Sequence, residues 1–128
     1  MASGATVTVY VEAPLCVGAK EELGRAHGSA GDVRVRAVCL PSSQRAAKLD
    51  LATVGANARR ATEDSAAVAY LEAPSPRRAP FTRSILETAQ VPWLSSSSGK
   101  SAMARLLRAI SSSGGSASLR EAVSDRLD

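Results

Sequence analysis

The sequence predicts a three-layer α/β domain in which helices cover both faces of a parallel sheet. The main observation is a strand–helix–strand unit within residues 62–99, with an apolar run at Ala66–Leu71, a helix at Phe81–Ala89 and a second apolar run at Val91–Leu94. Strands joined by a helical crossover pair in parallel, so this unit fixes the direction of the sheet. A second observation is that 45% of the residues are apolar but only 3% are aromatic. Ala, Val and Leu must therefore fill the core, which favours closely packed layers.

Two strands and one helix are predicted near the N-terminus. Thr6–Val11 is rich in β-branched residues, which favour a buried strand. Gly18–His27 has apolar residues at helical spacing and is predicted to be a helix. Val33–Val38 alternates apolar and basic side chains, the pattern of a strand with one wet face, and we place it at the edge of the sheet. Pro41–Lys48 follows as a polar loop.

Three helices are predicted outside the central unit and after that loop. Residues 50–63 form one, with Asp50 as its N-cap. An apolar stripe over Met103–Ile110 predicts another. Residues 111–117 are rich in serine and glycine, which predicts a flexible linker. Ser118–Glu121 has the sequence of a capping box and opens the last helix.

The predicted order of elements is therefore βαβαβαβαα, within one domain that spans residues 1–128 and has a tail at residues 1–5. Right-handed crossovers, with the second strand at an edge, give a four-stranded parallel sheet of order 2-1-3-4 with helices on both faces. This arrangement is a flavodoxin-like three-layer sandwich. Ligands of such sheets bind outside the carboxyl ends of the strands, so we look for function there.

Composition excludes several classes of partner. The net charge is +4, but the basic residues are spread along the chain without a block, which favours a solvated surface over a nucleic-acid-binding patch. No apolar run approaches the ~20 residues of a membrane span. No secretory signal peptide is recognisable. We therefore expect neither nucleic-acid binding nor a membrane span.

The two cysteines, Cys16 and Cys39, allow two interpretations. They are too few for a metal site, and the single histidine, His27, is not spaced to help them. They are either two small buried apolar residues or a disulfide. Both follow predicted neighbouring strands, which puts a bridge within geometric reach. A bridge would imply an oxidising compartment, that is, a periplasmic or secreted location.

Residues 56–99 resemble the first lobe of the type I periplasmic solute-binding proteins, the receptors for branched-chain amino acids of ABC transporters. Three pieces match in order: ANARRATEDS before AVAYL, the loop serine Ser75, and SILETAQVPWLSSSSG. The N-terminal VTVYVEAPL is similar to that family's first strand and turn. The resemblance implies a non-enzymatic, solute-binding domain tied to ABC transport. The chain has room for one of the family's two lobes, so we expect a truncated or degenerate relative.

The resemblance also implies site residues. In that family, hydroxyl and N–H groups after the third and fourth strands hold the α-carboxylate of the ligand, because a carboxylate needs several short donors. The matching positions, and so the expected contacts of a small amino acid, are Ser75, Ser97, Ser98 and Gly99. Gly99 departs from the family's threonine, and Glu72 stands where the family has glycine.

Two alternatives remain open from the sequence. The first is a structural or protein-interaction domain without a ligand, for which a homodimer could rebuild a two-lobed cleft. The second is an anion or nucleotide binder, because Ser95–Ser101 resembles a phosphate-binding loop in which Lys100 and Ser101 would hold the anion. We expect no catalysis and no cofactor or metal, since Glu12, Glu72 and the other carboxylates are scattered along the sequence.

Overall fold

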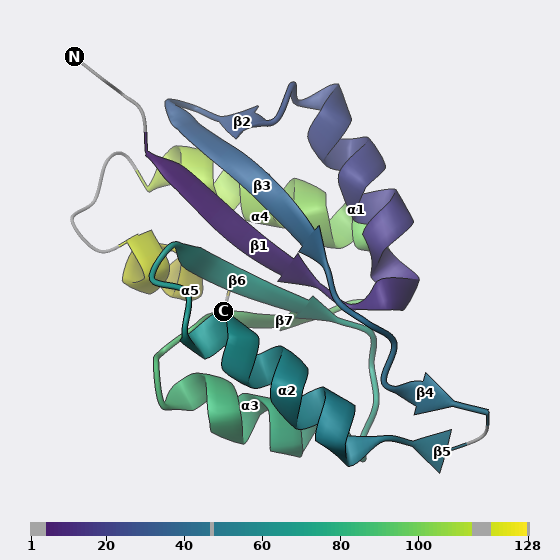
Figure 1. Cartoon of the computed structure of the whole chain (residues 1–128). Helices are drawn as coiled ribbons and strands as arrows, with labels where there is room; N and C mark the ends of the chain where they lie inside the picture. The colour runs from purple at the N-terminus through teal and green to yellow at the C-terminus, as the bar shows by residue number, and fades with distance from the viewer. Residues whose placement is uncertain (1–4, 47, 114–118, 128) are drawn as a thin grey trace.

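Four parallel strands form most of a five-stranded sheet in the computed structural model, which describes residues 5–46, 48–113 and 119–127 (Figure 1). The strands are β1 (Thr6–Val11), β2 (Ser29–Ala30), β3 (Val33–Cys39), β6 (Ala67–Glu72) and β7 (Trp93–Ser95), in the order β2-β3-β1-β6-β7. β1 pairs in parallel with β3 and β6, and β6 pairs in parallel with β7. The predicted order of the four parallel strands is therefore confirmed.

The sheet differs from the prediction in its fifth strand. β2 pairs antiparallel with β3, so the sheet is mixed and β3 is not its outermost strand. A strand of two residues is too short to show a period of two in the sequence. Its position is set by Gly28 and Gly31, whose φ angles of 71° and 61° lie in the left-handed region and allow the tight turns around it.

Within the described residues, five helices cover the two faces of the sheet. They are α1 (Ala13–Arg25), α2 (Leu51–Thr62), α3 (Ala79–Glu87), α4 (Gly99–Ser112) and α5 (Leu119–Leu127). In Figure 1, α2 and α3 lie in front of the sheet, and α1, α4 and α5 lie behind it. No helix in the described parts of the chain is long and apolar enough to cross a membrane.

The strands bury both faces, which gives two cores. Val7, Val9 and Val11 of β1 pack into the core behind the sheet, together with the apolar stripe of α4. Tyr10, at an alternate position of β1, packs into the core in front of the sheet. This alternation is the side-chain period of a strand, and it explains why β1 has apolar residues on both sides.

Two segments in the first half differ from their predicted form. α1 begins at Ala13 rather than at Gly18, because Pro14 occupies its first turn, where the missing N–H would have no helical partner in any case. The loop at Pro41–Lys48 contains most of a two-stranded hairpin, formed by β4 (Gln44–Arg45) and β5 (Lys48–Leu49). The predicted Asp50 cap is confirmed, since its side chain accepts from the N–H groups of Ala52 and Thr53.

The predicted linker at residues 111–117 begins too early. α4 continues through Ser112, because Ile110 is still buried against the sheet and holds the last turn in place. The rest of that linker and Ser118 of the predicted capping box lie outside the described residues. In α5, Ala122 and Val123 are buried, and Leu119 and Leu127 pack on the core behind the sheet.

Arg120 anchors α5 to the middle of the chain. Its Nε donates to the carbonyl of Ala67 over 2.6 Å, its Nη1 to that of Ala89 over 2.9 Å, and its Nη2 to that of Asp64 over 2.7 Å. These carbonyls belong to the turn after α2, the start of β6 and the turn after α3. One guanidinium therefore joins α5 to three separate segments.

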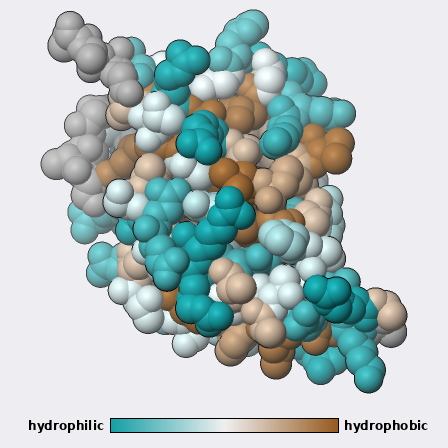
Figure 2. Space-filling view, viewed as in Figure 1, coloured by the Kyte–Doolittle hydropathy of each residue, from teal (hydrophilic) through white to brown (hydrophobic). Residues whose placement is uncertain are grey.

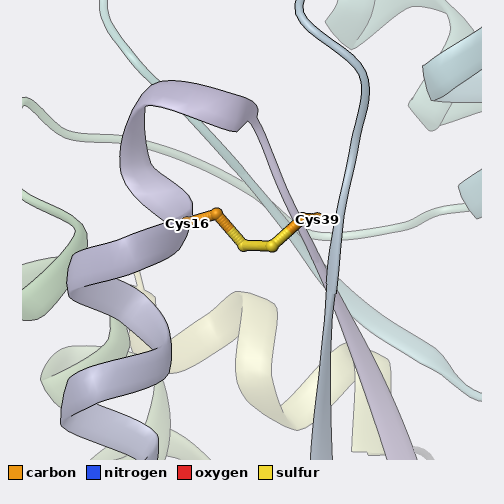
Figure 3. Close-up of a disulfide and its surroundings, with 2 residues drawn as sticks. All are labelled: Cys16 and Cys39. Atoms are coloured by element: carbon orange, nitrogen blue, oxygen red, sulfur yellow. A yellow bond between two sulfur atoms is a disulfide. The ribbon is translucent and has the colours of Figure 1, made fainter.

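A disulfide joins Cys16 of α1 to Cys39 at the end of β3 (Figure 3), so the second interpretation of the cysteines is confirmed. The two Cα atoms are 5.7 Å apart, and Cys16 is buried. Cys16 lies in the first turns of α1, which brings it back over the carboxyl end of β3. Disulfides form and persist in oxidising compartments, so the bridge is consistent with an extracytoplasmic location.

Candidate functional site

The candidate site lies at the carboxyl ends of β1 and β6, the two central strands. β1 continues into α1 behind the sheet, whereas β6 continues through a loop into α3 in front of it (Figure 1). Neighbouring strands whose connections leave to opposite faces form a switch point, and open α/β sheets bind ligands at such points. Glu72 is the last residue of β6, and Glu12 follows β1 directly.

Glu72 is held in place on both carboxylate oxygens. The Trp93 Nε1–H of β7 donates to Oε1 over 2.9 Å, and the Thr82 hydroxyl of α3 donates to Oε2 over 2.7 Å. Glu72 is 1% exposed and Thr82 is fully buried. The carboxylate therefore keeps one orientation, fixed by two neighbouring elements.

Arg78 bridges Glu12 and Glu72. Its Nη1 lies 2.6 Å from Glu12 Oε2, and its Nε lies 3.1 Å from Glu72 Oε2. Its Nη2 donates to the carbonyl of Ala73 over 2.6 Å, while the N–H of Ala73 donates to Glu12 Oε1 over 2.7 Å. Glu12 and Arg78 are 4% and 5% exposed. We call Glu12, Arg78 and Glu72 the Glu–Arg–Glu cluster.

The electrostatics of the cluster are dominated by burial. Burial raises the pKa of Glu12, and the negative charge of Glu72 adds to this. The N–H of Ala73 and the guanidinium of Arg78 lower the Glu12 pKa but do not cancel the effect of burial. Burial and the same two carboxylates also raise the pKa of Tyr70, a neighbour in β6. With both carboxylates ionised, the cluster carries one more negative charge than its single guanidinium neutralises.

The expected ligand-binding serines lie on two loops at this same edge of the sheet. Ser75 lies between β6 and α3, and its Oγ accepts from the N–H of Arg78 over 3.2 Å. Ser97 is exposed in the loop after β7. Ser98 is the N-cap of α4, and its Oγ accepts from the N–H of Ser101 over 3.1 Å. Ser75 and Ser98 therefore already make local hydrogen bonds, and Ser97 faces solvent.

The remaining predicted residues take part in packing and in a surface contact. Gly99 is buried, and a Cβ added to it would overlap the carbonyl oxygen of Leu15, so its lack of a side chain allows α1 and α4 to cross closely. Lys100 Nζ lies 3.9 Å from Glu21 Oε1, between side chains that are more than half exposed. An ion pair of this kind contributes little, so Lys100 is available at the surface.

A cavity of about 770 Å³ lies away from these residues, between α3, α5 and the edge strand β7. Arg83 and Trp93 line it on one side, with the Arg83 guanidinium carbon 4.8 Å from the centre of the Trp93 ring. Arg120 and Asp125 line it on the α5 side. The predicted binding residues are not part of its lining.

The sequence prediction missed the Glu–Arg–Glu cluster, because it treated Glu12 and Glu72 as scattered. The register of β1 with β6 brings together residues that are sixty positions apart in the chain. One signal was present: the tripeptide Glu-Ala-Pro occurs at the carboxyl end of both strands, as Glu12-Ala13-Pro14 after β1 and as Glu72-Ala73-Pro74 from the last residue of β6. Among the described residues, no three His, Cys, Asp or Glu side chains gather as metal ligands would.

No model of a protein family, no curated protein and no solved structure matches the chain. The resemblance to one lobe of the periplasmic solute-binding proteins therefore rests on the sequence pieces in residues 56–99 and on the N-terminal strand. The structure establishes an α/β domain with a mainly parallel sheet.

Proposed function

We propose that the chain is a non-enzymatic binding domain of the solute-receptor type, in truncated or degenerate form, with its site at the carboxyl ends of β1 and β6. The observation that carries this proposal is the buried Glu–Arg–Glu cluster at the switch point. Removing ionised groups from water costs several kcal/mol per ion, and apolar residues of similar size often serve stability as well or better. A costly polar cluster at the place where such sheets bind ligands supports a binding role.

The contacts within the cluster support binding over catalysis. The Glu72 oxygens accept from Trp93 and Thr82, and the Glu12 oxygens contact Ala73 and Arg78. Carboxylates whose oxygens already accept hydrogen bonds from the protein are suited to hold a bound cation in one orientation. A general base instead needs an oxygen that can reach a substrate proton. The disulfide supports a periplasmic or secreted location, as the link to ABC transport requires.

The test is calorimetric titration of the disulfide-bonded domain with leucine, valine, arginine and phosphate. We expect one of these solutes to bind saturably at one site per chain. Glu72→Gln should abolish that binding, because it removes a charge at the switch point. Glu87→Gln, on an exposed position of α3, is the matched control and should leave binding unchanged. Absence of saturable heat with every solute would contradict a receptor function.

A second candidate, a protein-interaction domain without a small ligand, is favoured by a different observation. Arg78 fills the switch point, and Ser75 and Ser98 make local hydrogen bonds. The face in Figure 2 mixes hydrophilic and apolar residues without one large apolar area. The edge of β7, beside the 770 Å³ cavity, offers a dimer unpaired backbone groups. Light scattering during size-exclusion chromatography would show a dimer in that case and a monomer for a simple receptor.

A further inference from the structure

We propose that Glu12 and Glu72 form a guanidinium-binding site which Arg78 fills as an internal occupant, and that the external ligand is a solute with a guanidinium group. This inference rests on the proposed function and names the class of ligand for the same site. It replaces the small amino acid held by its carboxylate, which the sequence resemblance implies, with a ligand held by its cationic end.

The charge of the cluster favours a cation. Two carboxylates face one guanidinium at 2.6 and 3.1 Å, and the three side chains are between 1% and 6% exposed. The ligand's own carboxylate would add a third negative charge to a site that water screens poorly. A guanidinium group instead supplies a positive charge that the two carboxylates attract.

The carboxylates are positioned independently of the Arg78 side chain. Thr82 and Trp93 fix both oxygens of Glu72, and the N–H of Ala73 fixes Oε1 of Glu12. A planar guanidinium presents several N–H groups in a fork that fits carboxylate oxygens, so an oriented pair of carboxylates selects it. The site would therefore keep its form when its occupant is exchanged.

Arg78 does not satisfy the site fully. Its Nε is buried and lies 3.1 Å from Glu72 Oε2 in an ion pair, yet its N–H makes no hydrogen bond. The side chain reaches the site while its backbone begins α3, and this attachment limits how the fork can turn. A free guanidinium has no such attachment and can direct its N–H groups at both carboxylates. This buried donor, which has an ion pair but no hydrogen bond, is a second observation that points to an external ligand.

Arg78 lies at the end of a loop whose first residue, Ala73, donates to Glu12, whereas the two hydrogen-bond donors of Glu72, Thr82 and Trp93, lie outside that loop. Residues Ala73–Arg78, which we call the strap, connect β6 to α3, and Pro74, Pro76 and Arg77 in it are exposed. Glu72 lies in β6, and Glu12 lies between β1 and α1. Movement of the strap would therefore withdraw Arg78 and leave Glu72 with its two fixed donors.

The test is chemical rescue of Arg78→Ala with guanidinium chloride at millimolar, non-denaturing concentrations. The variant should unfold at a lower temperature than the natural protein, and guanidinium in ~10-fold excess over its dissociation constant should raise the Tm by about 3–6 °C. Urea is the uncharged analogue and should not raise it, nor should sodium chloride at the same ionic strength. Arg77→Ala, the neighbouring exposed position, is the matched control and should show no rescue.

Trp93 provides a direct readout of the site. It is the only tryptophan in the sequence, and its Nε1–H donates to Glu72. We expect guanidinium to change the fluorescence of Arg78→Ala saturably, with a midpoint equal to that of the Tm shift. If the variant does not fold alone, guanidinium but not urea should restore its circular dichroism on refolding. Equal effects of guanidinium and urea in these measurements would overturn the proposal.

A titration of the natural protein separates this proposal from the function on which it rests. Arginine and citrulline differ only in the guanidinium, which is a neutral ureido group in citrulline. We expect arginine to bind at least ten-fold more tightly than citrulline or leucine. Preferential binding of leucine would overturn the ligand class but keep the receptor function. Rescue of Arg78→Ala together with no binding of any solute to the natural protein would keep the guanidinium site and overturn the receptor function.

Discussion

Arg78 decides whether the switch point is stable, because it is the cation that contacts both buried carboxylates. We predict that Arg78→Met lowers the free energy of unfolding by about 3–5 kcal/mol at neutral pH, since it leaves two buried charges without their partner. Urea unfolding measures this value. Arg77→Met, on an exposed position of the strap, should change it by less than about 0.5 kcal/mol. Similar values for the two variants would mean that the ion pairs contribute nothing.

The pH dependence of stability tests the other end of the cluster. The folded protein raises the pKa of Glu12 above its ordinary value of 4.5, so the folded state binds this proton more tightly than the unfolded chain does. The stability from this proton is complete below pH 4.5 and is lost as the pH rises through the folded pKa. Other groups titrate in the same range, so a variant must isolate the contribution of Glu12.

We therefore predict that the natural protein loses stability relative to Glu12→Gln as the pH rises from 4.5 towards neutrality. The glutamine variant has no proton to lose at this position, so the difference between the two free energies of unfolding reports Glu12 alone. Urea unfolding at a series of pH values measures it. A difference that grows in favour of the natural protein with rising pH would show that Arg78 and Ala73 outweigh burial.

Among the elements, the crossing of α1 and α4 is the most constrained contact. A Cβ on Gly99 would overlap the Leu15 carbonyl, and neither backbone can move alone. We predict that Gly99→Ala costs about 3 kcal/mol or more, at the upper end of overpacking effects. Gly24→Ala is the matched control, because a Cβ there meets no atom within 4 Å in the last turn of α1. That variant should be stabilised by up to ~1 kcal/mol. Thermal unfolding of the two variants would compare them directly.

The sequence predicts the elements that have strong local patterns. β1 begins and ends where its β-branched residues predict, and the α2 cap follows from Asp50 alone. The start of α1 was misplaced because Pro14 is compatible with both the end of a strand and the first turn of a helix. β2 has only two residues, too few to show an alternation of apolar and polar side chains in the sequence. It forms because it pairs with β3, which local sequence does not reveal.

The candidate site was harder to predict than the fold, since it depends on register. Whether Glu12 and Glu72 meet is decided by the pairing of β1 with β6, and a shift of one residue would place one of them on another face. Arg78 reaches them only because the strap turns back over the strand ends. The serines of the resemblance lie at the predicted edge of the sheet, but the cluster that characterises this edge could not be read from local sequence.

For the whole molecule, the disulfide is the main covalent constraint. It closes a loop between residues 23 positions apart, for which the chain-entropy model gives about 3 kcal/mol of stabilisation. We predict that the double variant Cys16→Ala with Cys39→Ala has a Tm lower by roughly 10 °C. A reducing agent should lower the Tm of the natural protein by a similar amount and leave the double variant unchanged. An equal response of both proteins to the reducing agent would exclude a role for the bridge.

The attachment of Arg120 has a consequence for the order in which the chain assembles. The three carbonyls that receive its guanidinium come from residues 64, 67 and 89, which are adjacent only after β6 and α3 have closed on each other. α5 therefore has no complete docking place until these segments have come together, so we expect it to dock after them. Ribosomal synthesis delivers residues 64–89 before α5, so α5 meets a surface that is already prepared for it.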